Sequence, residues 1–132
     1  ALEPHTRSRL LYAADAVTRF HAPVIILTGE RTSSAAEIFA ATLRESGRAR
    51  IIGTSTCGCV LAIRRRHTLP DGGALDISEM DYRTQAGTRL EGAGLVPDEK
   101  IEVERKDLRD GHDRALEQAM KSLKSNTGLA LR

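Results

Sequence analysis

The sequence predicts an α/β fold with mostly parallel strands, flanking helices and an antiparallel hairpin region. Residues 24–54 run through a β-branched apolar segment, a helix-like segment and a second β-branched segment. A strand, a helix and a strand in this order favour two parallel strands joined by the helix. Residues 60–84 hold two longer strand-like segments joined by the turn signal PDGG, which predicts an antiparallel hairpin.

The first predicted elements are a helix and a buried strand. In residues 8–20 apolar side chains recur at steps of three and four, and Ser8 is a suitable N-cap, so we expect a helix that ends before Pro23. The segment VIILT, residues 24–28, is continuously apolar and largely β-branched, as in a strand that is buried on both faces.

The next helix has the strongest pattern in the chain. It covers residues 33–46 and ends at Gly47, a residue suited to the position after a helix. We expect one face of this helix to be buried, and the residues that trace it are Ala35, Ile38, Phe39, Thr42, Leu43 and Ser46. The segment ARIIGT, residues 49–54, predicts the second buried strand.

The second half of the chain predicts the hairpin. Its strands are VLAIRRRHTL, residues 60–69, and ALDISEMDYRT, residues 74–84. Within the second strand the apolar spacing changes from two residues to three, which predicts a β-bulge near Ser78 and Glu79.

We expect the remaining residues to form a turn, two short strands and a helix. The turn is QAG at 85–87, and the strand candidates are TRLEG at 88–92 and KIEVE at 100–104. Residues 112–124 predict the last helix, with Asp110 as its cap. The apolar side of this helix is formed by Leu116, Ala119, Met120 and Leu123.

The composition is that of one ordinary globular domain. The chain has 132 residues, of which 40% are hydrophobic and 29% charged. Aromatic residues make up 3%, Trp is absent and the net charge is only +2, so we expect neither nucleic acid nor an anionic membrane surface as a partner. No apolar run approaches the roughly 18 residues of a membrane span. The chain begins without Met, and we expect it to be a segment of a longer protein.

Two cysteines, Cys57 and Cys59, flank one glycine. We expect them to be small residues packed in a tight turn, since a C-x-C pair rarely has the spacing and directions that a disulfide needs. The pair supplies at most half of a zinc site, and no second pair of ligands follows it. The sequence therefore predicts neither a metal nor a cofactor.

The segment TSSAAEI, residues 32–38, places small hydroxyl residues where the first buried strand gives way to a helix. A serine at the first turn of such a helix can act as a nucleophile, because the free N–H groups and the helix dipole stabilise a negatively charged oxygen. Ser34 and Glu37 also have the spacing of a capping box. A capping serine is the more common use of this pattern, so the residues alone leave both roles open.

The order of several motifs resembles the C-terminal processing, or tail-specific, serine proteases. PVIILTGERTSSAAEIFAATLRESGRARIIGTSTCG is similar to that family's apolar strand, SASASE-like nucleophile motif, helix, GRA segment and T-x-G-K-G turn. LPDGGALDISEMDYRTQAGTRLEGAGLVPD resembles its LPDG, paired-strand and GIxPD region. The resemblance covers residues 22–103. It implies a ClpP/crotonase-like core in a partial protease domain, residues 1–132, whose upstream part is absent.

Position by position, the resemblance implies that Ser34 is the nucleophile, since it lies three residues before the glutamate of the motif. It implies that the backbone N–H of Ala35 belongs to the oxyanion hole, that Ser33 is only a neighbour and that Thr32 lies at the start of the helix. Glu37 then has a structural role.

The general base of the family does not carry over to this chain. In the family it is a lysine 25 residues after the nucleophile, supported by a glutamine four residues later, and these positions are Cys59 and Ile63 here. A thiol is a poor substitute for a buried neutral amine. Two explanations stay open. A histidine upstream of the chain could be the base, as in tricorn-type and nisin-resistance-type relatives, or the protein could be an inactive peptide- or ligand-binding module, as retinoid-binding relatives are. We favour the first.

The histidines and the arginine run have plainer interpretations. No motif surrounds any of the four histidines. We expect His21, His67 and His112 to be surface or capping residues, and His5 is the least constrained of the four. The RRR segment at 64–66 is expected to be a solvated strand edge that discourages association between edges.

The sequence therefore predicts the core of a serine endopeptidase that acts on a polypeptide substrate, without a cofactor or membrane insertion, and open to forming a homo-oligomer. A crotonase-like acyl-CoA enzyme is a weaker alternative, because the LPDG and GLVPD segments have no role there. The resemblance suggests a periplasmic or secreted protein. Since the family's upstream N-x-G-G segment is missing, we expect residues 1–132 alone to hydrolyse little or nothing.

Overall fold

A computed structural model of the chain describes residues 20–127, so the helix predicted at residues 8–20 lies outside the described residues apart from its last position. Between these limits the elements, in chain order, are β1 (Val24–Thr28), α1 (Ala35–Glu45), β2 (Ala49–Gly53), β3 (Ala62–Thr68), β4 (Ala74–Met80), β5 (Glu99–Lys100), α2 (Arg105–Asp110) and α3 (Arg114–Thr127). The predicted α/β class is confirmed, since β1, β2 and β5 form a parallel sheet and β3 and β4 an antiparallel pair.

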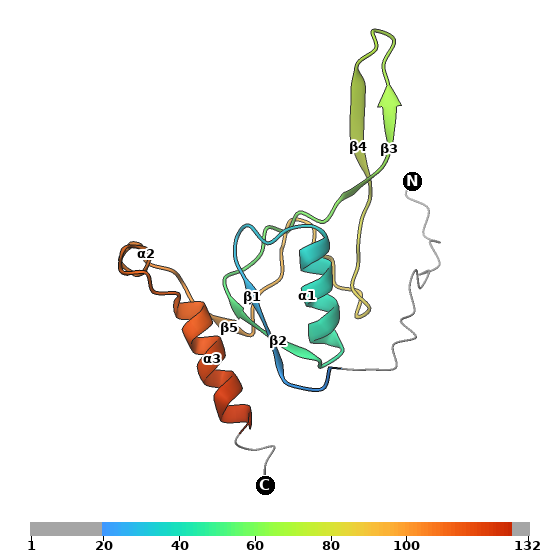
Figure 1. Ribbon diagram of the computed structural model, residues 1–132. Helices are drawn as coiled ribbons and strands as arrows, with labels where there is room; N and C mark the ends of the chain where they lie inside the picture. The colour runs from blue at the N-terminus through green and yellow to red at the C-terminus, as the bar shows by residue number, and fades with distance from the viewer. Residues whose placement is uncertain (1–19, 128–132) are drawn as a thin grey trace.

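The parallel sheet has the order β1-β2-β5 and lies between α1 and α3 (Figure 1). Strands β1 and β2 pair along their whole length, from Val24 opposite Ala49 to Thr28 opposite Gly53. At the end of this pairing the two backbones approach closely: a Cβ atom on Gly53 would lie 2.1 Å from the carbonyl oxygen of Thr28, and φ is +133° there. The approach therefore requires glycine at this position.

Helix α1 connects the two paired strands, as predicted, but it buries a different face. Its buried residues are Glu37, Ala40 and Ala41, whereas Phe39, on the face predicted to be buried, is 61% exposed. The small alanines let α1 pack closely against β2, and Glu37 is buried because its carboxylate is hydrogen-bonded. The predicted end of the helix is confirmed, since Gly47 has a φ of +68° and donates its N–H to Arg44.

The hydrophobic core lies between α1, β2 and the two loops that follow β2 and β4. Its buried members are Ala40, Ala41, Ile51, Val60, Leu90 and Leu95, and Ile26, Ile38 and Tyr82 pack against them. Because Val60, Leu90 and Leu95 come from loops, this core fixes the loops against α1 as well as holding the sheet and helix together.

The hairpin of β3 and β4 projects from the body of the molecule (Figure 1). The predicted bulge is confirmed: Ala62 pairs with Met80 and Ile63 with Ser78, which leaves Glu79 as an extra residue on β4. A second irregularity, between Ile63 and Arg66 on β3, was not predicted.

The C-terminal elements depart most from the predictions. The strand expected at 88–92 is only an isolated bridge between Arg83 and Arg89, and the strand expected at 100–104 is the two-residue β5. Asp110 ends the unpredicted helix α2. The cap of α3 is instead Asp113, whose carboxylate accepts the N–H of Leu116 at 2.9 Å. The expectation that Asp110 caps the last helix is therefore wrong, because Gly111 turns the chain in between.

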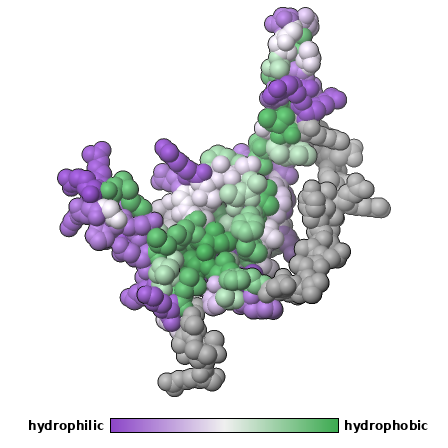
Figure 2. All heavy atoms as spheres, in the orientation of Figure 1, coloured by the Kyte–Doolittle hydropathy of each residue, from purple (hydrophilic) through white to green (hydrophobic). Residues whose placement is uncertain are grey.

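One face of the body carries a patch of exposed apolar atoms over β1, between α1 and α3 (Figure 2). Exposed apolar side chains of these elements are Leu27, Phe39, Leu116 and Met120. Among residues 20–127, no helix has the length and apolar character needed to cross a bilayer.

Candidate active site

Ser34 stands at the junction of the β1 loop and α1, as the sequence predicts, in an unusual backbone conformation. It is the N-cap of α1, with φ 54° and ψ −125°, and no other residue except glycine has a positive φ in the described part of the chain. A conformation of this kind costs roughly 1–3 kcal/mol and persists only where the surroundings enforce it. Strained residues of this type are common at functional sites, and the side chain is exposed.

The surroundings that enforce this conformation centre on Glu37, which is fully buried. Its Oε2 accepts the N–H groups of Ser34 (3.0 Å) and Cys59 (2.9 Å). Its Oε1 accepts the hydroxyl of Thr56 and the N–H of Gly58 (2.8 Å). We call these five residues the Glu37 network. It satisfies both carboxylate oxygens and joins the start of α1 to the loop after β2.

Two effects oppose each other in setting the pKa of Glu37. Burial raises this pKa, but the hydrogen bonds from Thr56, Cys59, Gly58 and Ser34 outweigh burial and lower the pKa below its ordinary value. The carboxylate is therefore charged at neutral pH. The interpretation of Glu37 as a structural residue agrees with these contacts, although the sequence showed only its capping-box partner.

Cys57 and Cys59 form a disulfide, so the expectation that this pair stays unlinked is wrong. Gly58 between them adopts a φ of +70°, which turns the chain sharply and brings the two Cα atoms to 5.2 Å, within the range for a disulfide. Gly58 is also confined from outside, since a Cβ there would lie 2.7 Å from the backbone nitrogen of Gly94. Cys59, at the position of the family lysine, thus carries no free thiol.

The disulfide loop, residues 57–59, directly contacts the serine loop, which we define as residues 29–34 between β1 and α1. The carbonyl of Cys59 accepts the N–H of Ser34 at 3.0 Å, and the N–H of Cys57 donates to the carbonyl of Thr32 at 2.9 Å. A ring of three residues restricts the unfolded chain little, by about 1.5–2 kcal/mol. Its main effect is therefore local, on the backbone around Ser34.

Ala35 occupies the first position of α1, next to Ser34. Its N–H has no acceptor among residues 20–127, as is usual for the first N–H groups of a helix. Ser33 is exposed and accepts the N–H of Ala36 through its carbonyl. The arrangement can place a nucleophilic hydroxyl and a free backbone donor side by side at the positive end of a helix dipole.

Glu91 is a residue near this site that the sequence analysis missed. Its half-buried carboxylate accepts the N–H groups of Val60 (2.7 Å) and Leu61 (3.0 Å), directly after the disulfide loop. Both bonds end on Oε2, and Oε1 has no partner within the described segment. A glutamate in a glycine-rich turn gave no signal in the sequence, since its partners are backbone groups thirty residues away.

The other predicted positions lie apart from Ser34. Ile63 is an exposed residue of β3, and His67 lies on the same strand. His21 is exposed, as predicted, and so is His112, which contacts Glu117 at 3.0 Å. His5 lies outside the described residues. The hydrogen bonds of Ser34 in the structure involve Cys59, Glu37 and Ile38 and no histidine.

An open pocket of about 490 Å³ lies beside the serine loop. Its lining combines the end of β1, the loop and the exposed side of α1, and comprises Ile26, Leu27, Gly29, Arg31, Thr32, Ser33, Ala36 and Phe39. The pocket is largely apolar, with one cation at its edge.

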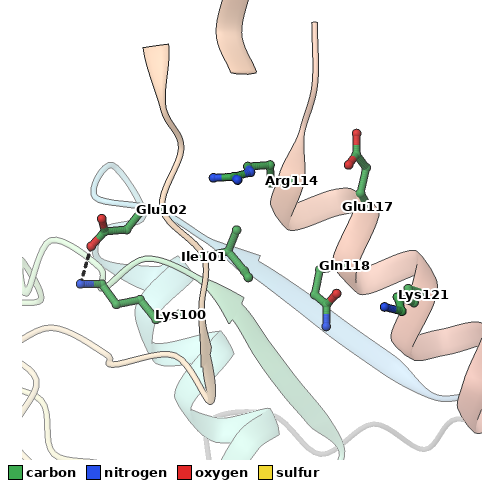
Figure 3. A pocket seen from close by; sticks show the side chains of 7 residues that line it. All are labelled: Lys100, Ile101, Glu102, Arg114, Glu117, Gln118 and Lys121. Carbon is green, nitrogen blue, oxygen red and sulfur yellow. Dashed lines mark ion pairs between the residues drawn. The ribbon is translucent and has the colours of Figure 1, made fainter. Parts of the chain in front are cut away.

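A second pocket, of about 520 Å³, lies between the end of the sheet and α3 (Figure 3). Most of the charged residues in its lining are paired: Lys100 contacts Glu102 at 2.6 Å, Arg114 contacts Glu104 at 3.1 Å, and Glu117 contacts His112 at 3.0 Å. No residue singled out by the sequence analysis lines it. The serine loop is therefore the better candidate site.

Comparisons with known proteins agree with the predicted resemblance. The family model of peptidase family S41 matches residues 3–101. A carboxyl-terminal-processing protease of Picosynechococcus is 35% identical over 83 residues, which are 63% of this chain and 20% of that protein. The tricorn protease of Thermoplasma acidophilum is 32% identical over 101 residues, 76% of this chain and 9% of that protein.

Solved structures give the same result. The crystal structure of the tricorn protease superimposes with a TM-score of 0.73 and 30% identity, over 79% of this chain and 10% of that one. The chain spans about a fifth of the length of the processing protease that it matches and a tenth or less of tricorn protease. The predicted relation to the C-terminal processing proteases is confirmed, and the chain belongs to peptidase family S41.

Proposed function

We propose that the protein is a serine endopeptidase and that Ser34 is its nucleophile. The observation that carries the proposal is the positive φ of Ser34 at the start of α1, enforced by the Glu37 network. A cap alone has no need of a strained backbone, whereas a nucleophile gains from being held out at a sharp turn. Family membership supports the same chemistry.

In the proposed reaction, Ser34 Oγ attacks the carbonyl carbon of the scissile peptide bond and gives its proton to a general base. The N–H of Ala35 donates a hydrogen bond to the negative oxygen of the tetrahedral intermediate. Collapse of the intermediate releases the amine and leaves an acyl group on Ser34, which water then hydrolyses. The substrate is a polypeptide.

We propose that the base is a histidine from outside this chain. Cys59 cannot serve, since its sulfur is bonded to Cys57. Glu91 is suited to orienting such a histidine, because its Oε2 is fixed by two backbone N–H groups while its Oε1 is left for another donor. A carboxylate that holds an imidazole in this way fixes its tautomer and stabilises its charged form.

The disulfide at Cys59 also favours one alternative, an inactive peptide-binding module on the same fold. A linked cysteine replaces the family lysine, so a protein without an external histidine would have no base. A homo-oligomer remains a prediction under either function.

Cleavage of fluorescein-labelled casein by the full-length protein separates these functions. We expect Ser34→Ala to reduce cleavage by at least about 10³-fold, because the covalent step is lost. Ser33→Ala is the matched control, one residue away, and should keep most of the activity. Full cleavage by Ser34→Ala would contradict the assignment of the nucleophile, and no cleavage by the wild-type protein would favour the binding module.

A further inference from the structure

We propose that the Cys57–Cys59 disulfide is a redox switch: a dithiol reductant opens it and thereby lowers the reactivity of Ser34. The inference rests on the proposed role of Ser34 and adds a regulation of the same site. It is carried by the position of the disulfide loop, by its exposure and by the hydrogen bonds that connect it to the serine.

The disulfide loop holds the serine loop at two points. The carbonyl of Cys59 accepts the N–H of Ser34 at 3.0 Å, and the N–H of Cys57 donates to the carbonyl of Thr32 at 2.9 Å. The two cysteines thus contact residues on either side of Ser33. Because the sulfur–sulfur bond fixes the distance between Cys57 and Cys59, it also fixes the spacing of these two contacts.

The same loop supplies half of the donors to Glu37. The N–H groups of Gly58 and Cys59 donate to Oε1 and Oε2 at 2.8 and 2.9 Å. The N–H groups of Ser34 and Cys59 donate to the same oxygen of Glu37, Oε2. A movement of the disulfide loop therefore affects the carboxylate that holds the backbone of Ser34. A strained φ such as that of Ser34 persists only where several constraints of this kind act together.

Both cysteine residues are exposed, while the residues that they organise are buried: Thr56 and Glu37 are each 8% exposed or less. A reductant can therefore reach the sulfurs without unfolding the core. The chain contains two cysteines, so exchange with a third thiol of the same chain does not compete.

The redox step balances as follows. A thiolate of the dithiol attacks the sulfur of one cysteine, which breaks the Cys57–Cys59 bond, forms a mixed disulfide and releases the other cysteine as a thiolate. The second thiolate of the reductant then attacks its own mixed-disulfide sulfur and releases the first cysteine. Two electrons and two protons pass from the dithiol to the protein, which ends with two thiols, while the reductant ends as a disulfide.

After reduction, Gly58 is free to leave its left-handed conformation and the two cysteines can separate. The donors to Glu37 from this loop are then no longer held together. We expect Ser34 to relax from its positive φ, which turns the hydroxyl away from the Ala35 N–H. The outcome is a folded protein with a less reactive serine.

The test uses the full-length protein, oxidised or treated with dithiothreitol, with mass spectrometry to measure the state of both cysteines. The first readout is the rate of fluorophosphonate labelling at Ser34, which should fall about tenfold on reduction and recover on reoxidation. The second is amide hydrogen exchange of residues 32–37 and 56–60, which should become faster. The double variant Cys57→Ser, Cys59→Ser should be labelled at the slow rate of the reduced protein, and the reductant should not change this rate.

The two readouts separate the switch from the proposed function. Absence of labelling in both redox states, with exchange still faster after reduction, would count against Ser34 as nucleophile but support a redox-controlled loop. Unchanged labelling and exchange after complete reduction would overturn the switch. Free thiols at both positions in the air-oxidised protein would overturn it as well. If the double variant does not fold, the labelling and exchange rates of the wild-type protein before reduction, after reduction and after reoxidation are sufficient to test the switch.

Discussion

Glu37 shows how a single residue can determine the geometry of this site. A fully buried carboxylate is costly unless hydrogen bonds satisfy it, and here four donors from both sides of the site do so. Because the donors belong to the start of α1 and to the loop after β2, the charge of Glu37 ties the two segments to each other.

Replacing Glu37 by Gln should destabilise the protein by about 2–4 kcal/mol at neutral pH, because the new NH₂ group faces two donors and two hydrogen bonds are lost. The pKa of Glu37 is lowered in the folded protein, so its contribution is present above the ordinary value of 4.5 and is lost as the pH falls through the lower folded pKa. Urea unfolding at pH 7, 4 and 3 should show the wild-type advantage shrinking in acid. A constant difference across this range would contradict the role of the charge.

Glu91 offers a test of the proposed orientation of the base. Glu91→Gln keeps a carbonyl oxygen for the N–H groups of Val60 and Leu61 but removes the charge. We expect kcat for casein cleavage to fall roughly 10²- to 10⁴-fold, with an unfolding midpoint close to that of the wild type. Glu91→Ala should lower both. Equal activity of wild-type protein and Glu91→Gln would show that Glu91 only holds the backbone of Val60 and Leu61 and does not orient the base.

At the scale of elements, the sheet and the hairpin contribute differently to stability. Strand β2 is central, and its residues Ile51 and Ile52 are fully buried. The β3–β4 hairpin projects from the body, and its ion pair between Arg66 and Asp76 is exposed to solvent, so the pair adds little to stability. Stability should therefore depend on β2 far more than on the hairpin.

Ile51→Ala should lower the free energy of unfolding by about 2–5 kcal/mol, because a fully buried side chain is truncated. Ile77→Ala makes the same chemical change on β4, where the side chain is 47% exposed, and should cost under about 1 kcal/mol. Urea denaturation measures both. Similar losses in the two variants would show that the hairpin is packed against another part of the protein.

The elements that the sequence predicted well are those whose pattern is local. The β1–α1–β2 unit follows from apolar runs and a glycine stop, and the bulge at Glu79 from a break in apolar spacing. The strand expected at 88–92 and the length of β5 depend on pairing partners, which a local pattern does not reveal. The buried face of α1 was missed because hydrophobicity favoured Phe39, whereas packing selected the alanines.

The candidate site was predictable only in part for the same reason. Ser34, Ala35 and the position of Cys59 follow from ordered motifs. The disulfide depends on the left-handed turn at Gly58, and the roles of Thr56 and Glu91 depend on contacts over 19 and 31 residues. No spacing rule in the sequence links these pairs.

At the scale of the whole molecule, three distant segments are joined beside Ser34: the start of α1, the loop after β2 and the loop that carries Glu91 and Leu95. The hydroxyl of Thr56 donates to Glu37 and accepts the N–H of Leu95 at 2.7 Å, which joins all three. These contacts hold the serine loop in one rigid unit, and in the proposed mechanism a histidine from outside the chain completes the reaction.

The most direct measurement of this claim is the mapping of a fluorophosphonate adduct on the intact, oxidised full-length protein. Mass spectrometry of the digested protein should place the adduct on Ser34, and the Ser34→Ala variant should not be labelled although it folds. An adduct on another serine, or no adduct on a protein shown to be folded, would contradict the account.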